Sequence, residues 1–123
     1  SEMTFFQKEI IMARISDMLG LVFISVYQDG DELIFKTVNE TFRFFHHQNC
    51  CESVYIESIV GDLEDLIGVP LLLAEESTMD DPNASDYGMW TFYKFATRKG
   101  YVDVRWNGSS NGYYSVSVSL VRS

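Results

Sequence analysis

Apolar and polar residues alternate along most of this chain, with the period of two that is typical of β-strands. Asp29-Gly30, between two such segments, is a strong signal for a β-hairpin. We therefore expect an antiparallel meander of three strands over residues 21–47. Further strands are expected at residues 53–59, 70–76, 89–97, 101–106 and 113–121, and the strand at 70–76 is expected to be short and buried.

Two segments follow a different pattern. Residues 4–18 space their apolar side chains roughly as a helix does, with Thr4 at the start and Gly20 beyond the end. Residues 62–67, followed by Gly68, fit one or two helical turns. The sequence thus predicts an α+β fold: a mostly antiparallel sheet of about six to eight short strands, an N-terminal helix and one short helix near 62–67.

The end of the chain is expected to form a hairpin between residues 101–106 and 113–121, with alternate serines facing solvent. Before it, residues 77–88 are acidic and rich in turn formers, so they are expected to form one long loop. No internal repeat and no long linker divides the sequence. We therefore expect a single domain over residues 1–123.

Composition narrows the class of protein. Of the 123 residues, 46% are hydrophobic and 15% aromatic, which favours a packed domain over disorder. No apolar run approaches the roughly 18 residues of a membrane span, and the start lacks the features of a secretory signal. Ser1-Glu2 precede Met3, which we take as the natural start. Two adjacent cysteines form no disulfide framework, so a cytoplasmic location is expected.

The charge is unevenly distributed. The formal net charge is −9, and ten of the eighteen acidic residues lie between Phe44 and Tyr93, where there is no lysine or arginine. A net negative charge repels nucleic acid and anionic membranes and favours a basic protein partner. We predict that carboxylates of this segment form a binding surface. The residues are Glu57, Asp62, Glu64, Asp65, Glu75, Glu76, Asp80, Asp81 and Asp86.

Two other interpretations of these carboxylates stay open. A solvated acidic face accounts for the same charge. A divalent metal site at Glu75, Glu76, Asp80 and Asp81 is the second alternative, although their spacing differs from that of an EF-hand loop.

The segment HHQNCC, residues 46–51, contains both histidines and both cysteines. His46, His47, Cys50 and Cys51 are candidate zinc ligands, of which His46, Cys50 and Cys51 are retained as the weak metal-site candidates. Two alternatives are a cysteine nucleophile with a histidine base and a vicinal disulfide between Cys50 and Cys51 that acts as a redox switch. Neighbouring side chains of an extended segment point to opposite faces, which opposes four ligands from six consecutive residues. We favour packing, with His46 continuing the apolar face of Phe44 and one cysteine in the core.

Other chemistry has little support in the sequence. The phosphate-binding, dinucleotide-binding, nucleophile-elbow and zinc-protease motifs are absent, and no cofactor is expected. Several tyrosines and tryptophans lie in the expected strands, where alternation favours packing on a sheet face. The loop NGSSNG, residues 107–112, has the backbone freedom and hydroxyl groups of a ligand loop, although a plain hairpin turn explains it too.

Six short segments of the sequence carry a family resemblance: CCESVYIE, GDLEDLIG, AEE, WTFYK, ATRKGYVDVRW and SNGYYS. With these, the chain resembles a small uncharacterised domain of bacteriophages and their bacterial hosts, over about Leu19 to Leu120. The family pattern often has an aspartate before the cysteines, where this chain has Asn49, which weakens a catalytic or metal role there. The resemblance implies a phage-related cytoplasmic protein, and small acidic phage proteins often bind and disable host machinery.

Three hypotheses follow. In the first, the chain is a phage-associated, non-enzymatic binding protein whose acidic surface engages a basic host protein, such as a defence or nucleic-acid enzyme. The second is a protein that binds or sequesters a small molecule near the aromatic strands and the 107–112 loop. The third is a metal- or thiol-dependent enzyme that uses His46, Cys50 and Cys51.

Overall fold

The computed structural model describes residues 9–123, which form nine strands in two antiparallel sheets and two 3₁₀ turns. The strands are β1 (Ile11–Met12), β2 (Ser25–Asp29), β3 (Glu32–Lys36), β4 (Thr41–Phe45), β5 (Ser53–Val60), β6 (Leu73–Asp80), β7 (Tyr87–Thr97), β8 (Gly100–Ser110) and β9 (Ser119–Arg122). The 3₁₀ turns are η2 (Ile15–Met18) and η3 (Leu63–Leu66).

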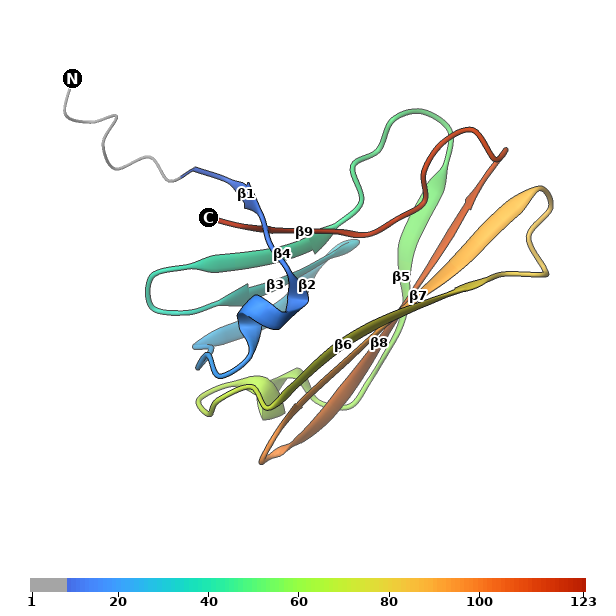
Figure 1. Ribbon diagram of the computed structural model, residues 1–123. Helices are drawn as coiled ribbons and strands as arrows, with labels where there is room; N and C mark the ends of the chain where they lie inside the picture. Colours follow the sequence, from blue (N-terminus) through green and yellow to red (C-terminus); the bar gives the residue numbers. More distant parts are fainter. Residues whose placement is uncertain (1–8) are drawn as a thin grey trace, which may run out of the picture.

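The two sheets lie one above the other as the layers of a β-sandwich (Figure 1). One sheet has the strand order β1-β9-β4-β3-β2 and the other the order β5-β8-β7-β6. The expected meander over residues 21–47 is confirmed as β2, β3 and β4. Its first turn passes through Gly30, whose φ of 59° is readily adopted by a glycine.

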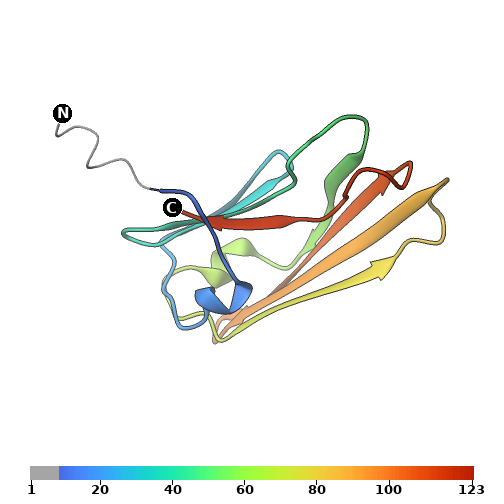
Figure 2. The same cartoon turned by 45° about the horizontal axis from the view of Figure 1, so that its top comes forward.

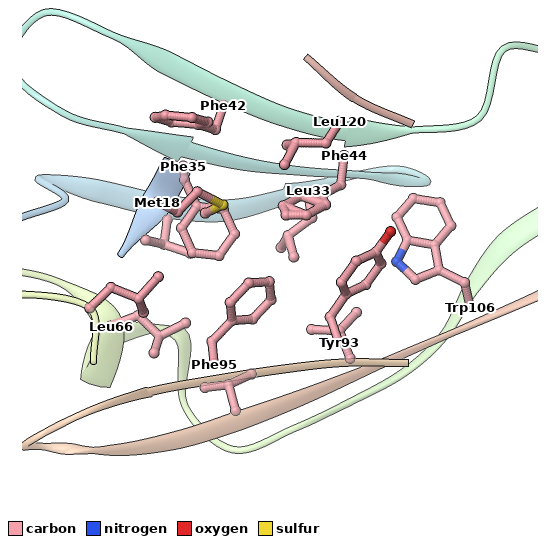
Figure 3. Packing of buried hydrophobic residues seen from close by; sticks show 14 of the residues in the cluster. Met18, Leu33, Phe35, Phe42, Phe44, Leu66, Tyr93, Phe95, Trp106 and Leu120 are labelled. Carbon is pink, nitrogen blue, oxygen red and sulfur yellow. The ribbon is translucent and has the colours of Figure 1, made fainter. Parts of the chain in front are cut away.

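The core fills the space between the sheets with aromatic side chains from both layers (Figure 3). Phe35 of one sheet lies 4.9 Å from Phe95 of the other, and Phe44 lies 4.7 Å from Tyr93, measured between ring centroids. Each fully buried phenylalanine contributes roughly 1.5–3 kcal/mol through the hydrophobic effect. The sandwich is therefore held together mainly by contacts between residues far apart in the sequence.

The two ends of the four-stranded sheet differ. At one end, Met18 of η2 and Leu66 of η3 close the core, and the N–H groups of Gly20 and Gly68 donate to the carbonyls of Leu71 and Phe23, both at 2.8 Å. At the other end, the loops 46–52, 81–86 and 111–118 lie close together (Figures 1 and 2). We call the first the closed end and the second the loop end.

The prediction of an α+β fold with an N-terminal helix is wrong, because residues 9–123 contain no α-helix. Residues 4–8 of that helix lie outside the described residues. Ile11 and Met12 instead pair with β9, and the rest is the single 3₁₀ turn η2. The short helix near 62–67 is likewise only a 3₁₀ turn. Long-range strand pairing therefore overrides a short helix-like spacing.

Four further predictions about strands and loops need correction. Nine strands form in the described residues, against six to eight expected. The loop expected at residues 77–88 is limited to residues 81–86, because β6 and β7 pair as far as Asp80 and Met89. The segment 70–76 gives rise to β6, which lies at an exposed edge. The expected hairpin of residues 101–106 with 113–121 does not form, because β8 pairs with β5 and β7 while β9 pairs with β4 in the other sheet.

No helix in residues 9–123 has the length and apolar character needed to cross a membrane.

Candidate interaction surface on the four-stranded sheet

The outer face of the four-stranded sheet carries side chains in rows that cross β5, β8, β7 and β6. The first row is Tyr55, Asn107, Trp90 and Met79; the second is Ser58, Arg105, Phe92 and Ser77; the third is Val60, Asp103, Lys94 and Glu75. Within residues 9–123, no other element lies across most of this face (Figures 1 and 2). An aromatic region and a charged region thus lie side by side on one open surface.

The aromatic part of this face is ordered by contacts between its own side chains. Trp90 and Phe92 stack with ring centroids 6.4 Å apart, and the guanidinium of Arg105 lies over the Trp90 ring at 5.1 Å. The Nε of Arg105 also donates to Glu57 at 2.6 Å, which lowers the pKa of that carboxyl below its ordinary value. Glu57 is therefore neutralised by Arg105 and adds little to a negative surface.

A groove of about 630 Å³ runs between the second and third rows. Phe92 lines it together with Lys94, Glu75 and Arg105. Around the groove, Val60 is 63% exposed, and Met79 is also exposed. Apolar surface rimmed by polar groups is typical of interaction sites.

The edge of the sheet beside this face is acidic. Glu75 and Asp80 are exposed on β6, and neither forms an ion pair within residues 9–123, although Glu75 lies opposite Lys94 in register. Residues 73–97 contain five acidic residues against one lysine. We call these five residues the acidic edge: Glu75, Glu76, Asp80, Asp81 and Asp86.

Glu76 and Asp80 lie on the opposite face of β6 from Glu75, and both remain exposed because β6 is an edge strand. Glu76 is the one of the two that lies beside a buried hydroxyl group. It pairs in register with Tyr93, whose side chain is buried and whose hydroxyl has no hydrogen-bond partner in the described structure. Burial raises the pKa of Tyr93 above its ordinary value, and the Glu76 carboxylate raises it further. Figure 3 shows this hydroxyl in the space between the sheets, on the side of Trp106.

Asp81 has a structural function in the turn between β6 and β7. One carboxylate oxygen accepts from the side-chain amide of Asn107 and the other from the N–H of Asn83, both at 2.9 Å. The Asn107 bond lowers the pKa of Asp81 most, and the Asn83 bond lowers it further. Asp81 is thus an ionised group that fixes the turn, while Asp86 at the far side of the turn is exposed.

The other predicted carboxylates lie at the closed end. Asp62 caps η3 by accepting from the N–H of Glu64 at 3.0 Å, and Glu64 and Asp65 belong to the turn itself. Lys99 donates to the backbone carbonyls of Glu64 and Ile67, at 3.2 and 2.8 Å. The structure therefore brings five of the nine predicted residues together in the acidic edge and places three at the opposite end of the sheet.

The segment HHQNCC is organised around Glu52, which the sequence analysis did not single out. The side chain of Glu52 has no exposed surface. Its carboxylate accepts from the N–H groups of Asn49 and Cys50, both at 2.9 Å, and from Nε2 of His46 at 2.8 Å. The Asn49 bond contributes most to lowering the pKa of Glu52 to about 2, against the opposing effect of burial.

The expected packing of one cysteine in the core is wrong. Cys50 and Cys51 are both exposed and are joined by a disulfide. The polar contacts of the segment hold the cysteines at the surface, because Glu52 takes the buried position. Within residues 9–123, no group of three or more metal-ligating side chains lies close enough to hold an ion.

The aromatic cluster of Trp90, Phe92 and Arg105 was also missed as a site. The signal was present in the segment MWTFYKFAT, where Trp90, Phe92 and Lys94 share one face by alternation. The opposite face carries Tyr93 and Phe95, so both faces are aromatic and the sequence does not show which one is buried.

These features define a two-layer antiparallel β-sandwich in which, among the described residues, one aromatic sheet face is left uncovered and is bordered by an acidic edge. The chain belongs to the family described as "Domain of unknown function (DUF7448)", which matches residues 5–120. A comparison with curated proteins found no match, and a comparison with solved structures found none either.

Proposed function

We propose that this chain is a non-enzymatic binding protein that engages a basic protein through the outer face of its four-stranded sheet. The observation that supports this function is the continuity of the uncovered aromatic rows with the acidic edge. Interfaces combine aromatic residues at the centre with a polar rim, and charge complementarity steers the partner into register. In this proposal Trp90 and Phe92 supply the centre, and the acidic edge selects a partner rich in lysine and arginine.

The partner that we propose is a host protein in the cytoplasm of a bacterium, as the resemblance to a bacteriophage domain suggests. A nucleic-acid enzyme or defence protein fits best. Glu75 and Asp80 are five residues apart on one strand, which corresponds to about 17 Å. Carboxylates distributed along an edge offer such an enzyme's basic channel several negative charges, as a phosphate backbone does. Binding there would block nucleic acid and inhibit the enzyme.

The experiment is an affinity capture from bacterial cytosol with four forms of the protein. These are the wild type, Trp90→Ala, the double variant Glu75→Lys with Asp80→Lys, and a control double variant, Asp29→Lys with Glu64→Lys. The control makes the same change in net charge at exposed positions away from the acidic edge. Thermal unfolding of each form first establishes that it is folded.

We expect one captured protein to be lost with Trp90→Ala and with the acidic-edge variant and to be retained by the control. Removing a central aromatic residue of an interface typically costs about 2 kcal/mol or more, enough to abolish capture of a moderate-affinity partner. Added nucleic acid should compete with this capture. A partner retained by both the Trp90→Ala and acidic-edge variants, or lost equally with the control, would show that another surface binds it.

A further inference from the structure

A second cavity, of about 440 Å³, lies at the loop end of the four-stranded sheet. Three separate segments contribute to its lining. They are Cys51 and Glu52 from the 46–52 loop, most residues between Asp81 and Tyr87 in the β6–β7 turn, and polar residues and Tyr114 from the end of β8 and the following loop. Its volume falls within the range of about 300–1,000 Å³ that is usual for small-ligand sites.

The β6–β7 side of this cavity is held in place by backbone contacts. The N–H of Asp81 donates to the carbonyl of Gly88 at 2.9 Å, and the side chain of Asp81 bonds Asn107 as described above. Gly88 allows the turn to fold this closely, because a Cβ there would lie 2.5 Å from the Cβ of Ala84. Asn107 is only 8% exposed, so a buried amide is fixed at the wall of the cavity.

The opposite wall is equally constrained. The Glu52 carboxylate fixes the backbone of the 46–52 loop, and the disulfide joins Cys50 to Cys51. His46 connects this loop to the loop 111–118, since its Nδ1 lies 2.7 Å from the carbonyl oxygen of Ser117. A cavity whose walls are fixed before binding loses little entropy when it takes up a ligand.

The lining limits the chemistry of that ligand. No lysine, arginine or histidine lines the cavity, which disfavours phosphates and carboxylates. Both carboxylate oxygens of Asp81 already accept hydrogen bonds, so Asp81 is a poor partner for an added cation. Both oxygens of Glu52, which also lines the cavity, likewise accept hydrogen bonds. Apart from Asp86, the remaining lining is mostly amide and hydroxyl groups, which both donate and accept, together with the rings of Tyr87 and Tyr114.

We propose that this cavity binds a neutral, polyhydroxylated ligand of the saccharide class. Sugar hydroxyls donate and accept hydrogen bonds, as the asparagine and serine side chains of the lining do. The C–H face of a sugar ring complements an aromatic face, which Tyr87 or Tyr114 supplies. Asp86 adds a carboxylate that accepts from a hydroxyl group. The cavity shares Asn107, Asp81 and Asp86 with the first row and the acidic edge. Trp90, Glu75 and Asp80, which test the binding of a basic protein, do not line it, so either proposal can fail without the other.

The test is an NMR titration of the ¹⁵N-labelled protein with glucose, galactose, mannose, N-acetylglucosamine and the disaccharide cellobiose, each separately. We expect at least one of these sugars to shift the amide signals of residues 81–87 and 107–114 with a Kd of about 1 mM. Spermidine is titrated in parallel as a cationic probe.

Tyr114→Ala should weaken this binding at least about tenfold, because the ring contributes contact area without supporting the core. The matched control is Tyr101→Ala, which removes an exposed tyrosine outside the cavity and should leave the affinity unchanged. Three results would overturn the proposal: no shift with any sugar at concentrations of about ten times that Kd, equal binding by the Tyr114→Ala variant, or binding of spermidine alone.

Discussion

The side chains of Glu52 and His46 show how a polar segment folds at the loop end. The two nitrogens of His46 face the carbonyl oxygen of Ser117 and the carboxylate of Glu52, at 2.7 and 2.8 Å. Both partners are hydrogen-bond acceptors, so each ring nitrogen of His46 lies opposite an oxygen of a different loop segment. The ring therefore joins two loops that are distant in sequence, and the histidine acts as a structural group.

The buried carboxylate makes stability depend on acid pH. The pKa of Glu52 is about 2 in the folded chain and 4.5 ordinarily, so its contribution is fully present above pH 4.5 and is lost as the pH falls toward 2. We expect Glu52→Gln to lower the free energy of unfolding at neutral pH and to flatten this acid-dependent loss. Urea unfolding at a series of pH values measures both effects.

Glu64→Gln is the control for that series, because Glu64 is exposed at the closed end. It should retain the pH profile of the wild type. If Glu52→Gln lost stability on acidification as steeply as the wild type, the Glu52 carboxylate would not be the group responsible.

At the scale of strands, β8 packs closely against the segment that leads into β9. A Cβ on Gly108 would lie 2.6 Å from the Cβ of Val116 and 2.9 Å from its carbonyl oxygen. Gly108→Ala should therefore destabilise the fold by about 1–3 kcal/mol through overpacking. Chemical denaturation measures the change. Ser109→Ala, one residue further on, should stay within about 0.5 kcal/mol, and an equal loss in both variants would contradict this account.

Local patterns in the sequence predicted many elements but not their partners. Alternation located β5 and β7 to within two residues, and Asp62 marked the start of η3. Alternation located only the first part of β8, which continues to Ser110 into the segment 107–112 that was expected to be a loop. The pairing of β9 with β4 joins residues that are far apart in the chain, and no local pattern encodes such a choice. The same pairing extends to β1 and explains why the helix-like spacing of residues 4–18 gave the wrong prediction.

The candidate site was predictable only in part, for a related reason. The acidic residues were visible in the composition, but their positions depend on the fold: Asp80 lies on the edge strand, whereas Asp65 lies at the closed end. The aromatic rows were hidden because β7 has aromatic residues on both faces. Which face is buried is decided by the other sheet, whose Phe35 and Phe44 pack on Phe95 and Tyr93.

At the scale of the whole molecule, the proposed function depends on two features that occur on the same side: an uncovered sheet face and the negatively charged edge beside it. The inner faces of both sheets enclose the core. Within residues 9–123, most of the outer face of the four-stranded sheet is uncovered, and the acidic edge lies along one side of it. Like charges held together on a fold cost stability through repulsion. A basic partner would relieve that repulsion while covering the half-buried aromatic side chains of Trp90 and Phe92.

The salt dependence of partner capture tests this account most directly. The affinity of the wild type for its captured partner is measured at two salt concentrations, about 50 and 300 mM, together with that of the Glu75→Lys, Asp80→Lys variant. Since exposed charges are screened at high salt, we expect the wild type to bind its partner at least about tenfold more weakly at the higher concentration. The variant should bind weakly at both concentrations. An affinity that is the same at both concentrations would contradict it.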